Sequence, residues 1–69
     1  MRVDVEMLKA EMDKQNMTIS DLAEASKVDK STISRLLNEQ RTCSVNTAQA
    51  LVQALNISSV KAGKIFFGR

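Results

Sequence analysis

The sequence predicts an all-α protein, a compact bundle of five short helices that forms one domain over residues 1–69. Two observations indicate helices. The chain has no proline and is rich in Leu, Val, Ile, Ala and Met, which suits helices. Its apolar residues also recur at spacings of three and four. The third observation is length, because a chain of 69 residues buries only about 60% of its unfolded surface and supports a single core.

The first segment predicts a helix over residues 4–15. Met1, Val5, Leu8 and Met12 recur every three or four positions, which places them on one side of a helix with acids and lysines on the other.

Two short helices follow. Thr18 with Asp21 three residues later matches a capping box, which predicts a second helix over residues 19–26. Asp29 is expected to cap a third helix in "KSTISRLLN", with Ile33, Leu36 and Leu37 facing inward. The residues left to face outward are Lys30, Ser31, Thr32, Ser34, Arg35 and Asn38.

The rest of the chain predicts a loop and two helices. "NEQRTC" is expected to be the loop, and Ser44 is expected to cap a charge-free fourth helix, "VNTAQALVQAL". This helix should be buried through Ala48, Leu51, Val52 and Leu55. After the break at "NISS", "SVKAGKIFF" predicts a fifth helix packed through Val60, Ile65 and one phenylalanine. Gly63 inside it costs about 1 kcal/mol of helix propensity.

The spacing between the second and third helices predicts their geometry. Only "SKVD" separates them, so Leu22 and Ile33 can meet in the angle, Ala23 permits a close approach and Val28 fills the corner. In such a helix-turn-helix the first helix braces the second, whose polar face projects outward. The predicted core consists of Leu22, Ala23, Val28, Ile33, Leu36, Leu51, Val52 and Leu55.

At this point the chain resembles the Cro and phage-repressor family of helix-turn-helix proteins. The similarity runs without a gap from about Met17 to Ile57, through "TISDLAE", "VDKSTISRLLN" and "SVNTAQALVQALNI". These match the family's brace helix, recognition helix and closing helix. The resemblance implies a λ-repressor-like fold and binding of double-stranded operator DNA.

The resemblance also implies a set of DNA-binding or partner-binding residues. Lys30 would reach a guanine edge or a phosphate, and Arg35 would make a bidentate guanine contact. Ser31, Thr32 and Ser34 would offer hydroxyls to bases or phosphates. Asn38 and Arg41 would grip the DNA backbone, and Thr18 would do so through N–H groups at the start of the second helix. The full set is Thr18, Ile19, Lys30, Ser31, Thr32, Ser34, Arg35, Asn38 and Arg41.

Three positions depart from the family pattern. Ile19 stands where glutamine is common, and Lys27 and Glu39 stand where glycine is common, so the latter two need a strained backbone or an altered turn. Three interpretations of Ile19 stay open: packing against Met17 or the flank of the third helix, a harmless surface position, or a contact with another protein.

The charge distribution supports a nucleic-acid partner only weakly. Residues 1–26 hold three cations and six acids, a net charge of −3, whereas residues 27–69 hold seven cations and two acids, a net charge of +5. A basic stripe on one face is typical of nucleic-acid binders, but the total is only +2.

The leading hypothesis is therefore a small phage-type transcriptional regulator of a genetic switch, which binds promoter DNA through its third helix. Paired half-sites imply a homodimer or a cooperative pair. The alternative is an antirepressor that binds a cognate repressor protein through the same face, supported by Ile19, Glu39, the low net charge and the acidic first helix.

Catalysis, cofactors and metals are not expected. Cys43 is the only cysteine and histidine is absent, so the chain offers no disulfide and no Cys/His zinc site, and Cys43 should be inert. Neither a glycine-rich phosphate loop nor a plausible pair of buried carboxylates is present. No apolar run approaches the roughly 20 residues of a membrane span, and the first residues lack a signal-peptide core. These features predict a soluble cytoplasmic protein that is not an enzyme.

Overall fold

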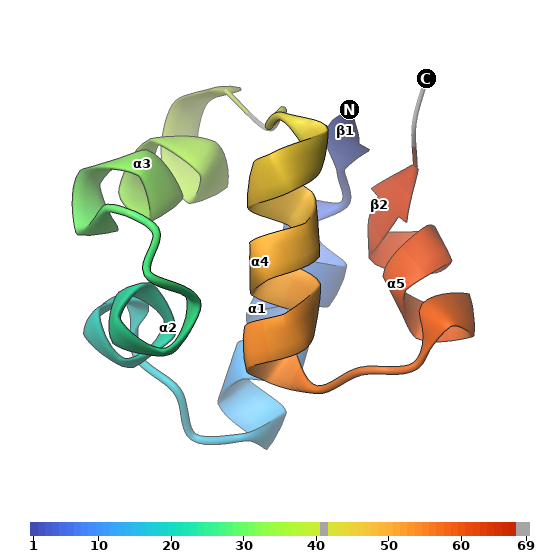
Figure 1. Cartoon of the computed structure of the whole chain (residues 1–69), viewed down its shortest axis with the longest axis horizontal. Helices are drawn as coiled ribbons and strands as arrows, with labels where there is room; N and C mark the ends of the chain where they lie inside the picture. The colour runs from blue at the N-terminus through green and yellow to red at the C-terminus, as the bar shows by residue number, and fades with distance from the viewer. Residues whose placement is uncertain (41, 68–69) are drawn as a thin grey trace.

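The computed structural model describes residues 1–40 and 42–67, and within them the chain forms a bundle of helices with one small strand pair (Figure 1). The elements in chain order are β1 (Arg2–Val3), α1 (Val5–Lys14), α2 (Ile19–Ser26), α3 (Lys30–Arg35), the π-helical turn η1 (Leu36–Gln40), α4 (Val45–Leu55), α5 (Ser59–Ile65) and β2 (Phe66–Phe67). The predicted all-α bundle of five helices is confirmed. None of the helices in this described part is long and apolar enough to cross a membrane.

Side-chain caps fix where four of the helices begin. Asp4 accepts from the Met7 N–H ahead of α1, and Thr18 and Asp21 form the predicted capping box of α2. Ser44 caps α4, as predicted, and Ser58 caps α5. These oxygens bind N–H groups that have no partner inside their helices. The sequence therefore locates these starts well.

The start of α3 is different. Asp29 occupies the N-cap position, but its side chain makes no capping hydrogen bond. Its backbone carbonyl instead accepts from the Ile33 N–H at 3.1 Å. The predicted side-chain cap at Asp29 is therefore wrong.

The end of the third helix also differs from expectation. Residues 38–40 are not loop, because they belong to the π-helical turn η1 that continues directly from α3. Nothing in "LLNEQ" breaks a helix, and the wider π turn keeps both Leu36 and Leu37 buried. Glu39 therefore needs no left-handed backbone. Lys27 does, with φ 61° and ψ 26° at the end of α2.

A short antiparallel strand pair joins the two ends of the described chain. Arg2 pairs with Phe67 and Val3 with Phe66, and the Asp4 N–H donates to the Ile65 carbonyl at 2.7 Å. The sequence pattern does not indicate these strands, because each has only two residues and periodicity needs longer segments.

One hydrophobic core lies between the helices. The residues predicted for it are either buried or packed against it: Leu22, Ile33, Leu36, Leu51 and Leu55 are buried, whereas Ala23, Val28 and Val52 are half-buried. Of the residues expected to pack from the fifth helix, Ile65 and Phe66 are buried as predicted, whereas Val60 is 71% exposed and its predicted packing is wrong. Met1 is also exposed, since it precedes β1 and is not part of α1.

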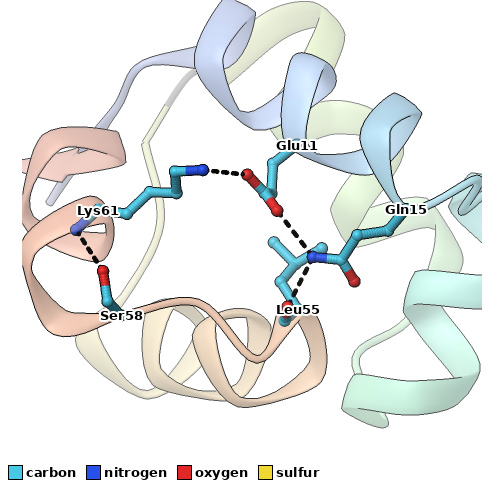
Figure 2. A network of polar contacts seen from close by, with 5 residues as sticks. All are labelled: Glu11, Gln15, Leu55, Ser58 and Lys61. Atoms are coloured by element: carbon cyan, nitrogen blue, oxygen red, sulfur yellow. Dashed lines mark hydrogen bonds and ion pairs between the residues drawn. The ribbon is translucent and has the colours of Figure 1, made fainter.

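A buried carboxylate connects three helices at the back of the bundle (Figure 2). Glu11 of α1 is buried, and its Oε1 accepts from Lys61 Nζ of α5 at 2.9 Å. Gln15 Nε2 donates both to Glu11 Oε2 at 2.8 Å and to the Leu55 carbonyl near the end of α4 at 2.7 Å. The hydrogen bond from Gln15 and the ion pair with Lys61 lower the pKa of Glu11, and the same ion pair raises the pKa of Lys61. The network ties α1, α4 and α5 together.

We predict that Lys27→Gly stabilises the protein. The left-handed conformation costs a residue with a Cβ about 1 kcal/mol or more, whereas glycine adopts it freely. Lys27 is exposed, so the change removes no core contact. Unfolding by urea should show a gain in the free energy of unfolding of roughly 0.5 kcal/mol, because the larger unfolded-state entropy of glycine offsets part of the relieved strain. Lys27→Ala keeps the Cβ and should show no such gain, and equal stability of the two variants would contradict the strain argument.

We also predict that Glu11 makes the fold sensitive to acid. Its pKa is below the ordinary value of 4.5 in the folded state, so its stabilisation is complete above 4.5 and is lost as the pH falls through the lower folded-state pKa. Glu11→Gln should therefore be less stable at neutral pH, and its stability should fall less between about pH 5 and pH 2. Urea unfolding over that range measures both effects. Glu6→Gln removes an exposed acid of the same helix and should keep the acid sensitivity of the parent.

Candidate nucleic-acid interface

Helix α3 is held at the surface by α2, which contacts both α3 and α4. Figure 1 shows α2 and α3 together on one side of α4. The contact is apolar, because Leu22 of α2, Ile33 of α3 and Leu51 of α4 are all fully buried in one cluster. With Ile33 and the following leucines turned inward, the opposite side of α3 must face solvent. The brace and projecting helix predicted from the sequence are thus present.

The outer side of α3, called here the α3 face, is made of Lys30, Ser31, Thr32, Ser34 and Arg35. Lys30, Ser31 and Arg35 are exposed, and Thr32 and Ser34 are half-buried. Within the described residues, neither cation of this face takes part in an ion pair. Both are therefore available to an anionic ligand, and the hydroxyls between them can donate or accept hydrogen bonds.

Asn38 is less available than the sequence suggested. Its Nδ2 donates to the Ser34 carbonyl at 2.8 Å and lies 3.4 Å from Ser34 Oγ. The donor end of the amide therefore stabilises the exit from α3, and only its carbonyl oxygen remains to face a ligand. A carbonyl oxygen cannot donate a hydrogen bond to a phosphate. Asn38 can therefore contact the DNA backbone only if its hydrogen bond to Ser34 breaks. Arg41, the other predicted backbone contact, lies outside the described residues.

Thr18 also has a structural role. Its hydroxyl accepts from the Asp21 N–H at 3.1 Å, and the Asp21 carboxylate accepts from the Thr18 N–H at 3.0 Å. These bonds lower the pKa of Asp21, the bond from the Thr18 N–H first, so the head of α2 carries a carboxylate at neutral pH. A phosphate approaching here would meet that negative charge. The phosphate contact predicted for Thr18 must therefore compete with the capping box.

Ile19 lies at the edge of an open hollow between α1, the start of α2 and η1. The side chain is half-buried and packs against the core, which supports the packing interpretation for part of its surface. The Ile19 hollow has a volume of about 370 Å³. Its lining residues come from α1, the following turn, α2 and η1: Lys9, Met12, Asp13, Met17, Thr18, Ile19 and Leu37. The hollow thus has an apolar floor and a charged rim.

The rim residues Lys9 and Asp13 were not among those predicted from the sequence. A signal was available, since Lys9, Met12 and Asp13 follow one another at spacings of three and one in a predicted helix and so lie near one side of it. What the sequence lacked was the position of η1, which brings Leu37 to the same hollow.

The charge around the α3 face is only slightly positive. Residues 27–40 hold Lys27, Lys30 and Arg35 against Asp29 and Glu39, a net charge of +1 from three cations and two acids. All five side chains belong to exposed residues. Selective contacts must therefore come from the placement of individual groups, because the general attraction to phosphate is small.

The described part of the chain shows neither a metal site nor a reactive thiol. It contains no group of three or more Cys, Asp or Glu side chains that could hold a metal ion. Cys43 is half-buried, and burial raises the pKa of its thiol. A thiol with a raised pKa is mostly protonated and unreactive, as expected for this residue.

The comparisons with known proteins agree with this geometry. A family model described as helix-turn-helix matches residues 8–61, a span that contains α2, α3 and α4 in full. Neither the curated proteins nor the solved structures give a match to the chain. Proteins of the matched family are DNA-binding regulators and are generally not enzymes. The chain therefore belongs to the helix-turn-helix family, and it is a DNA-binding regulator of that family.

Proposed function

We propose that this protein is a phage-type transcriptional regulator of a genetic switch that occupies promoter DNA through the α3 face. One observation carries the proposal: Lys30, Ser31 and Arg35 are exposed on a short helix that α2 and the core hold outward. These three side chains take part in no ion pair within the described residues, and their groups match those that read base edges and phosphates.

The dimensions of α3 suit the major groove. Its six residues span about 9 Å at 1.5 Å per residue, and the groove is about 12 Å wide. With the first turn of α3 in the groove, Lys30 meets a phosphate or a guanine edge. Arg35 lies one turn later, where its guanidinium can donate two hydrogen bonds to a guanine. Ser31 and Thr32 supply hydroxyls to neighbouring bases or phosphates.

Specific binding to operator DNA requires two copies of a protein this small. A single α3 face offers few base contacts, and operators read by helix-turn-helix proteins consist of half-sites one helical turn apart. Two copies double the contacts and also fix the spacing of the half-sites. We therefore propose a homodimer, or a cooperative pair, on the operator.

We predict that Lys30→Ala and Arg35→Ala impair DNA binding in different ways. Loss of a phosphate contact by Lys30→Ala should weaken binding to all sequences and reduce the slope of log affinity against log salt by about 1. Loss of a guanine contact by Arg35→Ala should cost about 1–3 kcal/mol and reduce discrimination between sequences. Fluorescence anisotropy with promoter and scrambled duplexes at several salt concentrations measures both quantities.

Lys64→Ala is the control for these variants. It removes one exposed cation from α5, which lies on the far side of α4 from α3 (Figure 1). Binding by this control should stay close to that of the parent. If all three variants bind like the parent, α3 does not contact the DNA.

A second candidate function is favoured by the Ile19 hollow. We propose as the alternative that the protein is an antirepressor, which binds a cognate repressor through the same side of the molecule and blocks its DNA binding. An apolar floor with a rim of Lys9 and Asp13 suits an apolar side chain of a protein partner better than it suits a phosphate. The carboxylates of Asp21 and Glu39 nearby disfavour DNA and are compatible with a basic partner surface.

We predict that Ile19→Gln separates the two functions. Ile19 is already half-buried, so covering its remaining surface with a partner side chain contributes less than the about 1.5–3 kcal/mol of a complete burial, and the substitution should weaken the repressor complex by a few-fold to roughly tenfold. It should leave DNA binding unchanged or improved, because glutamine can donate to a phosphate. Isothermal titration against the cognate repressor and against promoter DNA tests this. Ala25→Gln, at an exposed position near the other end of α2, is the matched control. Equal repressor binding by the Ile19→Gln variant and the parent would contradict the protein contact.

A further inference from the structure

Ser34 differs from the other side chains of the α3 face because it already accepts a hydrogen bond from within the protein. Its Oγ lies 3.4 Å from Asn38 Nδ2, and the same nitrogen donates to the Ser34 carbonyl at 2.8 Å. The other side chains of this face make no such bond with the described residues. One hydroxyl of the face is therefore oriented by the protein before any ligand arrives.

The Ser34 carbonyl determines which end of the Asn38 amide faces α3. At 2.8 Å from a carbonyl oxygen the amide must present its nitrogen, because two oxygen acceptors at this distance would repel each other. The nitrogen carries two hydrogens, so one bonds the carbonyl and the other is left for Ser34 Oγ. The contact with Oγ is the longer and weaker of the two. It still keeps the hydroxyl hydrogen of Ser34 away from the side that faces Asn38.

The hydroxyl hydrogen of Ser34 has no acceptor within the described chain. A helical serine commonly donates to the carbonyl four residues earlier, which here would be that of Lys30, but the described residues show no such bond. The side chain is half-buried on α3, so a ligand on this face would cover it. Ser34 therefore presents an unused donor to that ligand.

We propose that Asn38 is a positioning residue, which makes Ser34 a reader of hydrogen-bond acceptors on the base edges. A serine hydroxyl that rotates freely bonds donors and acceptors alike. With Asn38 in place, a base acceptor satisfies the remaining O–H, whereas a base donor leaves that O–H unpaired in a contact that excludes water. This role rests on the DNA binding proposed above and adds a source of base preference to it.

The orientation of Ser34 indicates which bases the α3 face favours. Lys30 and Arg35 can only donate hydrogen bonds, so with Ser34 oriented all three side chains require acceptors. In the major groove guanine presents two acceptors, N7 and O6, whereas cytosine presents the donor N4. We therefore expect the strand under α3 to be rich in guanine.

Fluorescence anisotropy with promoter duplexes that each carry one changed base pair tests the reading role. At one position the parent should favour a base that presents an acceptor by roughly tenfold. Asn38→Ala frees the hydroxyl and should lose most of this preference, as should Ser34→Ala. Combining the two substitutions should cause no further loss, because both act on the same contact. Gln40→Ala removes another exposed amide of η1 and should keep the preference of the parent.

Asn38→Asp gives a sharper test, because it replaces a donor with an acceptor. The carboxylate should draw the Ser34 O–H toward itself and leave Oγ to accept from the ligand, which shifts the preference toward the amino groups of cytosine or adenine. Its negative charge weakens binding to every duplex, so the ratio between duplexes is the quantity to compare. If Asn38→Ala and Asn38→Asp both keep the base preference of the parent, Asn38 has no positioning role.

Nuclear magnetic resonance of the free protein tests the orientation without DNA. Ser34→Ala removes the acceptor Oγ and should shift the side-chain amide resonances of Asn38, whereas those of Gln40 should stay unchanged. Unshifted Asn38 resonances would contradict the contact even if DNA binds. If the orientation is present but the parent does not distinguish promoter from scrambled duplex, the proposed function fails and Ser34 reads no base. If Lys30→Ala and Arg35→Ala impair binding while the Asn38 variants keep the preference, only the positioning role fails.

Discussion

The apolar contact of α2 with α3 and α4 is the interaction on which the other features depend. Leu22, Ile33 and Leu51 have no exposed surface, and full burial of such side chains stabilises each by about 1.5–3 kcal/mol. The same contact fixes which side of α3 faces solvent. Stability and the orientation of the binding face therefore come from one set of leucine and isoleucine side chains, so a substitution there would affect both together.

The two halves of the molecule are held in different ways. Apolar packing holds α2, α3 and α4, whereas α1, α4 and α5 share a polar network around the buried carboxylate of Glu11 (Figure 2). A buried charge is tolerated only with partners, and here Lys61 and Gln15 supply them.

Much of the fold could be predicted because its determinants are local. The capping box of Thr18 and Asp21, the cap at Ser44 and the apolar spacing of the helices depend on residues three or four apart. The features that were missed depend on distant contacts. Glu11 and Lys61 are 50 positions apart, and the strands form only because Val3 meets Phe66. In the site, the residue types on α3 were predictable, but the hollow beside Ile19 depends on the approach of Leu37 to α1 and α2, which no sequence pattern indicated.

The shape of the site is common to many DNA readers, so the choice of ligand depends on its chemistry. Around α3 the charge is only +1, and the head of α2 carries the capping carboxylate of Asp21. A duplex with one charge about every 1.7 Å attracts such a surface weakly, so the proposed DNA binding would depend on direct contacts of Lys30 and Arg35. A protein partner needs no such charge and can use the apolar floor beside Ile19. The choice between the two ligands therefore depends on whether the direct contacts proposed for Lys30 and Arg35 outweigh the apolar contact proposed at Ile19.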